Sequence, residues 1–147
     1  METQRQNTGE TQIDYTAAPL SDIAGAVVAD GVVDASEATA LRNRIFADGQ
    51  VDRPEAEMIF AINNGVSGKN NSPRWDALFV EALAAFVLED DSTPGVIDEE
   101  EGTFLVNGIQ GDGQLDANER VLLQTIRARA TRIDSPTLNN FLTQNSI

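Results

Sequence analysis

Residues 30–63 read DGVVDASEATALRNRIFADGQVDRPEAEMIFAIN, and residues 94–127 read PGVIDEEEGTFLVNGIQGDGQLDANERVLLQTIR. The two stretches align without a gap at an offset of 64 residues. Of the 34 aligned pairs 14 are identical, where chance would give roughly two. The sequence therefore predicts an internal duplication, with copies at about residues 20–63 and 84–130.

A shorter motif, Asp-Gly-x-apolar-Asp-x-x-Glu, occurs twice in each copy, at a spacing of 18 residues. It begins at Asp30, Asp48 and Asp112, and in the third occurrence Pro94 replaces the first aspartate. The glycine suits the left-handed conformation that ends a helix. The second aspartate suits an N-cap, and the glutamate three residues later completes a capping box. Each motif therefore predicts one helix ending and another beginning.

Apolar periodicity between these turns predicts an all-α fold, a compact bundle of about seven helices. The helix expected at about residues 75–89 is apolar nearly all round, so we expect it at the centre of the bundle, anchored by Trp75. Residues 1–16 are predicted to be a disordered tail, and residues 17–147 a single domain. The other helices are expected at about residues 19–29, 35–47, 53–63, 99–109 and 117–132, with a last short one from Ser135 and a polar loop over 64–74.

The composition restricts the chemistry that the chain can perform. The formal net charge is -14, and there is no cysteine and no histidine. Catalysis through a thiol or an imidazole is therefore excluded, and a metal would have to be a hard cation such as Ca²⁺ or Mg²⁺ bound by oxygen. The charge disfavours nucleic acid, and no apolar run is long enough to span a membrane. We expect a cytoplasmic protein with a protein partner, and the sequence leaves its oligomeric state open.

The carboxylates of the turns have two readings. As N-caps and first-turn acids they stabilise helices, which explains their spacing without any ligand. As oxygen ligands they would bind a divalent cation. The candidate metal ligands are Asp30, Asp34, Glu37, Asp48, Asp52, Glu55, Asp90, Asp98, Glu101, Asp112, Asp116 and Glu119.

An EF-hand loop offers a test of the second reading, because its glycine stands at position 6 and its last glutamate at position 12. In the third turn Asp98 and Glu101 fall on positions 9 and 12, and Asp90 and Ser92 fall on positions 1 and 3. None of the other three turns has an acidic side chain at position 1 or position 3. The third turn is therefore the best candidate, and any affinity should be weak.

Glu81 is the one acid inside the longest apolar stretch, Ala77–Leu88, of the expected central helix. A hydrolase using paired carboxylates would need such an acid in a groove, with a perturbed pKa. A glutamate at the helix rim, or one paired with an arginine, is the simpler explanation. We therefore expect the protein not to be an enzyme.

The recurring form from Ala29 to Glu37, and again from Ala47 to Glu55, resembles the TerB-like family of tellurite-resistance proteins. The seven-helix plan with an apolar central helix is similar too. The resemblance implies a compact helical bundle whose acidic face binds divalent cations and docks partner proteins in stress-response or membrane-associated complexes. The matching acids would be those of the turns and their repeats, with Pro94 departing from the pattern.

Two functional hypotheses follow. The first is a non-enzymatic interaction module of the TerB-like kind, with weak affinity for Ca²⁺ or Mg²⁺ through its acidic turns. The second is a phage-type or multi-subunit accessory or assembly protein, whose acidic face serves only solubility and binds no metal.

Overall fold

A computed structural model of the 147-residue chain describes residues 18–47, 49–89, 94–109 and 115–147. These residues form seven helices and one pair of two-residue strands, which confirms the predicted all-α fold. The tail predicted over residues 1–16 lies outside the described residues. The elements are α1 (Leu20–Asp30), α2 (Ala35–Ile45), α3 (Arg53–Val66), α4 (Pro73–Leu88), β1 (Val96–Ile97), α5 (Glu99–Ile109), α6 (Ala117–Arg129), β2 (Arg132–Ile133) and α7 (Pro136–Gln144).

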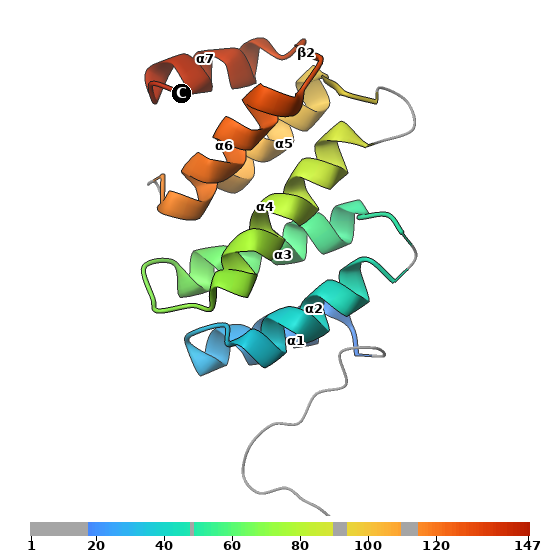
Figure 1. Cartoon of the computed structure of the whole chain (residues 1–147), viewed down its shortest axis with the longest axis vertical. Coiled ribbons are helices and arrows are strands. Elements are labelled where there is room, and N and C mark those ends of the chain that lie inside the picture. Colours follow the sequence, from blue (N-terminus) through green and yellow to red (C-terminus); the bar gives the residue numbers. More distant parts are fainter. Residues whose placement is uncertain (1–17, 48, 90–93, 110–114) are drawn as a thin grey trace, which may run out of the picture.

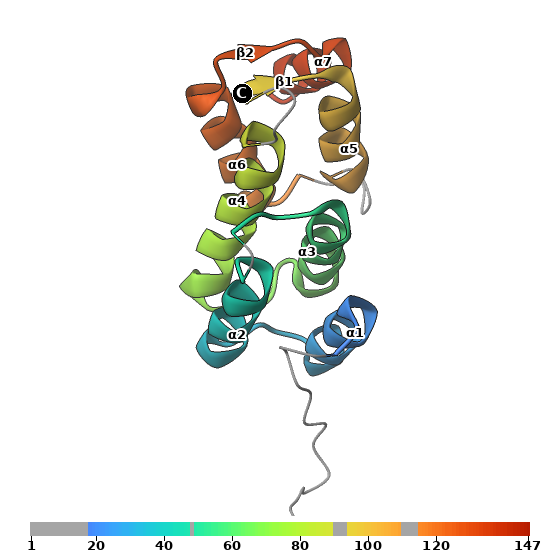
Figure 2. The ribbon, with the colours of Figure 1, turned by 90° about the vertical axis from the view of Figure 1, so that its right-hand side faces the viewer.

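The helices stack in two layers along the long axis of the molecule (Figure 1). One layer contains α1, α3, α5 and α7, and the other contains α2, α4 and α6, as the rotated view shows (Figure 2). Neighbours within a layer pack against each other, and α3 also packs across the layers against α4. Every helix except those at the ends therefore has a helix on both sides.

The turn chemistry sets where the helices begin and end. The backbone φ angles of Gly31, Gly49 and Gly95 are 87°, 83° and 77°. Residues that carry a Cβ rarely adopt this left-handed conformation. Asp34, Asp52 and Asp116 are N-caps of the helices that follow them. The predicted N-cap role of the second aspartate is confirmed at these positions, and Gly31 ends α1 in the left-handed conformation as predicted. Gly49 and Gly95 are also left-handed, but the C-caps of α2 and α4 are Phe46 and Glu89, so there the predicted helix-ending role is wrong.

Helix α4 lies at the centre of the molecule and contacts α2, α3, α6 and β1. Its buried side chains include Trp75 and Phe79, both fully inaccessible. Phe79 meets the ring of Phe60 from α3 edge to face, with the two centroids 5.9 Å apart. The predicted central position is confirmed, although α4 also has an outer side, where Asp76 and Glu81 are exposed.

The packing pairs recur in the order that the 64-residue offset predicts. Helix α1 packs on α3 as α4 packs on α6, and α2 packs on α4 as α5 packs on α7. Helix α4 thus takes part in both sets, as the last helix of the first and the first helix of the second. This recurrence is consistent with the duplication, which stays a prediction.

The predicted helix over residues 117–132 is wrong at its end, since α6 stops at Arg129. Residues 132–133 instead form β2, which pairs in parallel with β1. The backbone N–H of Thr131 donates to the carbonyl of Gly95 at 2.7 Å, and that of Asp134 donates to the carbonyl of Ile97 at 2.7 Å. This pairing draws the chain out of the helical path.

The ends of two other helices also differ from the prediction. Helix α3 continues to Val66, and α4 begins at Pro73, so the loop expected over 64–74 is shorter. Among the described residues, no helix combines the length and the apolar character needed to cross a membrane.

Candidate functional site

In all four turns the second aspartate and the glutamate three residues later form a reciprocal capping box. In each box the aspartate Oδ1 accepts from the backbone N–H of the glutamate, and the glutamate Oε1 accepts from the backbone N–H of the aspartate. The eight donor–acceptor distances lie between 2.8 and 3.0 Å. The pairs are Asp34 with Glu37, Asp52 with Glu55, Asp98 with Glu101, and Asp116 with Glu119. Each box satisfies two backbone donors that would otherwise lack a partner.

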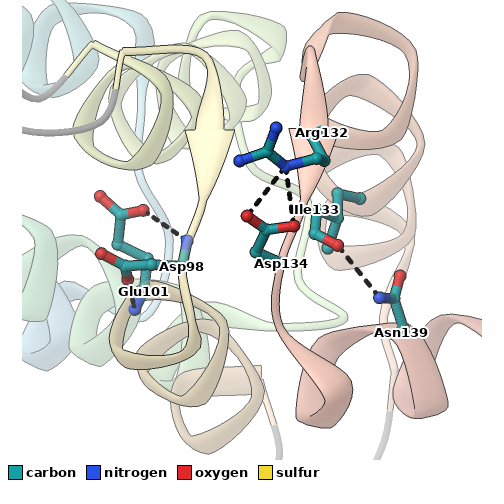
Figure 3. A network of polar contacts seen from close by, with 6 residues as sticks. All are labelled: Asp98, Glu101, Arg132, Ile133, Asp134 and Asn139. Carbon is teal, nitrogen blue, oxygen red and sulfur yellow. Dashed lines mark hydrogen bonds and ion pairs between the residues drawn. The ribbon is translucent and has the colours of Figure 1, made fainter.

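The third turn keeps this geometry although Pro94 replaces an aspartate (Figure 3). Asp98 follows β1 directly, and Glu101 lies in the first turn of α5. On the neighbouring strand, Nε of Arg132 lies 2.8 Å from both carboxylate oxygens of Asp134. Asp90 and Ser92, the other ligands predicted for this turn, lie outside the described residues.

The helix-capping hydrogen bonds of these acids bear on the prediction that they bind a metal ion. Asp48, Asp90 and Asp112 fall outside the described residues, so their positions are not given. Over the residues whose placement is known, no group of three acidic, histidine or cysteine side chains could hold a metal ion. Binding of a divalent cation stays a prediction, while the capping role of the described pairs accounts for their spacing.

The first turn brings two carboxyl groups together beyond the capping pair. Asp30 at the end of α1 shares a side-chain hydrogen bond with Glu37 in the first turn of α2. Burial, that hydrogen bond and the charges of Asp34 and Asp30 raise the pKa of Glu37 to about 7, although the backbone N–H of Asp34 acts to lower the pKa. Glu37 therefore holds a proton at mildly acidic pH, when most carboxyl groups have lost theirs.

The fourth turn differs from the others because its aspartate also joins distant parts of the chain. Asp116 Oδ2 accepts from Nδ2 of Asn63 at 2.9 Å and from Oγ of Ser67 at 2.8 Å, and both donors belong to the C-terminal end of α3. The Oδ1 atom of the buried Asn63 accepts from the indole N–H of Trp75 and from Nδ2 of Asn118, each at 3.3 Å. This network connects α3, α4 and α6 through polar atoms.

Glu99 makes contacts with α7 that the sequence did not predict. It belongs to the acidic run in the first turn of α5, and such a run usually forms only a solvated helix start. Here its carboxylate accepts hydrogen bonds from the side chains of Thr137 and Ser135, at the beginning of α7. The hydrogen bond from Thr137, followed by that from Ser135, lowers the pKa of Glu99. The side chain is exposed but ties α7 to α5.

An open apolar groove of about 350 Å³ lies between α4 and α6. Its apolar residues are Ala77 and Val80 on α4 and Val121 on α6, and its polar rim contains Asp76, Glu81 and Asn118. Val121 is 47% exposed, and it is the only large hydrophobic side chain in the described part of the chain that is exposed. Nδ2 of Asn118 donates to Oδ1 of Asp76 at 2.9 Å across the groove.

Glu81 lies at this rim and forms an ion pair with Arg42 of α2, with 2.8 Å between Oε1 and Nη2. The Glu81 side chain is 51% exposed. A hydrolase would need this acid enclosed among apolar side chains, which is the environment that raises a carboxyl pKa. The groove that the hydrolase hypothesis required is therefore present, but Glu81 stands at its edge and is held by an arginine, as the simpler explanation predicted.

The sequence contains one indication of the groove, and it lies outside the residues that define the repeated turn motifs. Val121 aligns at the 64-residue offset with Glu57, an exposed position of α3. One copy therefore has an exposed valine where the other copy has an exposed glutamate, so the two surfaces differ at this position. Asn63, Ser67 and Asn118 could not be found in this way, because their importance depends on which helices become neighbours.

Comparisons with known proteins complete the description of the site. A scan against protein-family models, a search of curated proteins and a search of solved structures each found no match. The resemblance to the TerB-like family has neither support nor conflict from these comparisons and stays a prediction.

Proposed function

We propose that this chain is a non-enzymatic interaction module that docks a partner protein in the groove between α4 and α6, while its acidic turns serve to cap helices. The observation that carries the proposal is the exposure of Val121, at 47%, over a groove whose other apolar residues are Ala77 and Val80.

Single exposed apolar side chains are common and by themselves need no explanation. At this groove three features coincide: an exposed valine, a concave surface and a rim of polar side chains. Apolar patches rimmed by polar residues are typical of interaction sites. The other large apolar side chains of the described residues are at least partly covered, so the exposure of Val121 stands out from the rest of the surface.

The arrangement of the acids supports binding over catalysis. The described capping pairs use their carboxylate oxygens on backbone N–H groups, and Glu81 is engaged with Arg42. A general acid or nucleophile needs its carboxylate directed at a substrate. A capped helical scaffold of this kind is suited to presenting a surface to a partner.

Site-specific photocrosslinking tests this proposal. A benzophenone amino acid replaces Val121 in one protein and Glu57, the repeat-related exposed position on α3, in a control protein. We expect an extract of the source organism to give a discrete adduct from position 121 that position 57 does not give. The same adduct should disappear when Val80→Asp is added to the crosslinking protein, because that change places a charge in the apolar lining of the groove.

Identical adducts from both positions would show that the acidic surface binds proteins indiscriminately, and the proposal would fall. Absence of an adduct from position 121 would also overturn it. Circular dichroism of each variant checks that the helical fold is intact before the comparison is made.

A further inference from the structure

We propose that the occupant of the groove is a basic amphipathic helix, which packs aliphatic side chains on Val80 and Val121 and places a lysine or arginine against Asp76. This inference rests on the proposed function, because it names the chemistry of the partner that the groove would dock.

The shape of the groove favours a helix. Its residues come from two helices that pack side by side, at positions 77, 80 and 81 of α4 and 118 and 121 of α6. Each set has the spacing of three or four residues that places side chains on one face of a helix. The groove is open rather than enclosed, so it suits side chains presented by a larger partner better than a buried small molecule.

The charges at the rim favour a basic partner. Asp76 receives a hydrogen bond from the neutral amide of Asn118, and no lysine or arginine of the described residues forms an ion pair with it. Glu81, in contrast, already has Arg42 as its partner. Asp76 is thus the rim carboxylate that a cationic side chain of a partner can reach, in a chain whose net charge of -14 attracts basic surfaces.

Two other occupants fit these charges less well. A second copy of this chain would bring another net charge of -14 and a second pair of acidic rims against the first. The N-terminal segment, residues 1–17, contains Glu2, Glu10 and Asp14 but only one basic residue, Arg5. Either occupant would bring negative charges against the acidic rim of the groove.

The hydrogen-bond network beneath the rim supplies a readout. Asn118 donates both to Asp76 at the rim and to the buried Asn63, which in turn accepts from the indole N–H of Trp75. A cation that pairs with Asp76 competes with Asn118 and so disturbs this chain of hydrogen bonds. Trp75 is the single tryptophan of the protein, and its fluorescence therefore reports on the groove.

The experiment uses three synthetic helical peptides of about 18 residues that share one leucine face, about the length of five turns. Their polar faces carry lysine, glutamine or glutamate. We expect the lysine peptide to bind saturably, to shift the NMR methyl signals of Val80 and Val121, and to change the emission of Trp75. The glutamine peptide should bind about tenfold more weakly, and the glutamate peptide should not bind detectably.

Variants locate the binding. Asp76→Asn and Val121→Ser should each weaken binding of the lysine peptide by about five- to tenfold, since each removes one of the three proposed contacts. Glu100→Gln removes the same charge at an exposed position of α5 and should change the affinity less than about twofold. Circular dichroism and the melting temperature of each variant exclude unfolding as the cause.

Different failures have different meanings. If Glu100→Gln weakens the lysine peptide as much as Asp76→Asn does, the attraction is diffuse and the basic-helix inference is wrong. If the glutamine peptide binds as tightly as the lysine peptide, or if no peptide moves the two valines while the crosslink at position 121 persists, docking stands and the basic partner is discarded. A concentration-dependent dimer that Val121→Ser abolishes would assign the groove to a second copy and overturn the inference.

Discussion

Glu37 is a residue of the described turns whose protonation should affect stability near neutral pH. Burial is the main cause that raises its pKa from the usual 4.5 to about 7. The folded state then binds this proton more tightly than the unfolded state. The corresponding stabilisation is fully present below pH 4.5 and is lost as the pH rises towards 7.

We expect Glu37→Gln to remove this dependence, because glutamine resembles the protonated acid and retains an acceptor for the capping box. Because the side chain is partly exposed, the gain of the variant over the natural protein at pH 8 should be about 1 kcal/mol or less, with little difference at pH 4.5. Urea unfolding across this range measures it. The control is Glu101→Gln, at the equivalent position of the third turn; an equal pH-dependent gain there would contradict the special role of Asp30 beside Glu37.

The caps themselves are predicted to differ in strength. Asp34→Ala removes an exposed N-cap and should lower the free energy of unfolding by about 1 kcal/mol. Asp116→Ala removes a cap and also the acceptor of Asn63 and Ser67, so it should cost about 2–3 kcal/mol. Chemical denaturation of the two variants at pH 7 gives the comparison. Equal losses would mean that the hydrogen bonds from α3 add nothing to the capping box.

Within the helices, replacing glycine by alanine at three positions should have opposite effects on the free energy of unfolding. An added Cβ at Gly25 in α1 meets no atom within 4 Å, whereas at Gly102 in α5 it would lie 2.0 Å from Oγ of Ser135. At Gly108 it would lie 2.6 Å from the ring of Phe60.

Gly25→Ala should therefore raise the free energy of unfolding by about 0.5–1 kcal/mol through helix propensity. Gly102→Ala and Gly108→Ala should lower it by about 1–3 kcal/mol, because α7 and α3 must move away. Thermal or urea unfolding decides the sign for each. A stabilising Gly102→Ala would show that α5 and α7 are not in the close contact described.

Some helix boundaries could be predicted from the sequence, and others could not. Helix starts such as those after Asp34 and Asp52 could be predicted, because a capping box depends only on residues three positions apart. The end of α6 could not be predicted, since it depends on the pairing of Arg132 with Val96, 36 residues earlier. The position of the groove also depends on α6 lying beside α4, although the replacement of Glu57 by Val121 in the second copy can be seen in the sequence. The acidic turns attracted attention because their motif is local and repeated.

For the whole molecule, the net charge of -14 makes stability depend on ionic strength. Salt screens the repulsion among the carboxylates, so raising NaCl from about 10 to 300 mM should raise the melting temperature. If the acids act only as caps, CaCl₂ and MgCl₂ at matched ionic strength should have the same effect as NaCl.

Calorimetric titration with Ca²⁺ and Mg²⁺ completes this test. Saturable heat, together with a rise in melting temperature beyond that in NaCl, would favour the metal prediction. Loss of that excess in Asp98→Asn would place the ion at the third turn. With neither signal at millimolar Ca²⁺, the cation-binding hypothesis would have to be given up.

The position of α4 has a consequence for how the chain can fold and evolve. One side of this helix closes the interior formed with α2 and α3, and another closes the interior formed with α6. A cut after Leu88 would leave the first piece with an uncovered apolar wall and deprive the second piece of that wall. We therefore expect neither piece to fold alone and the whole molecule to unfold in one cooperative step. A split protein should regain its structure only when both pieces are mixed.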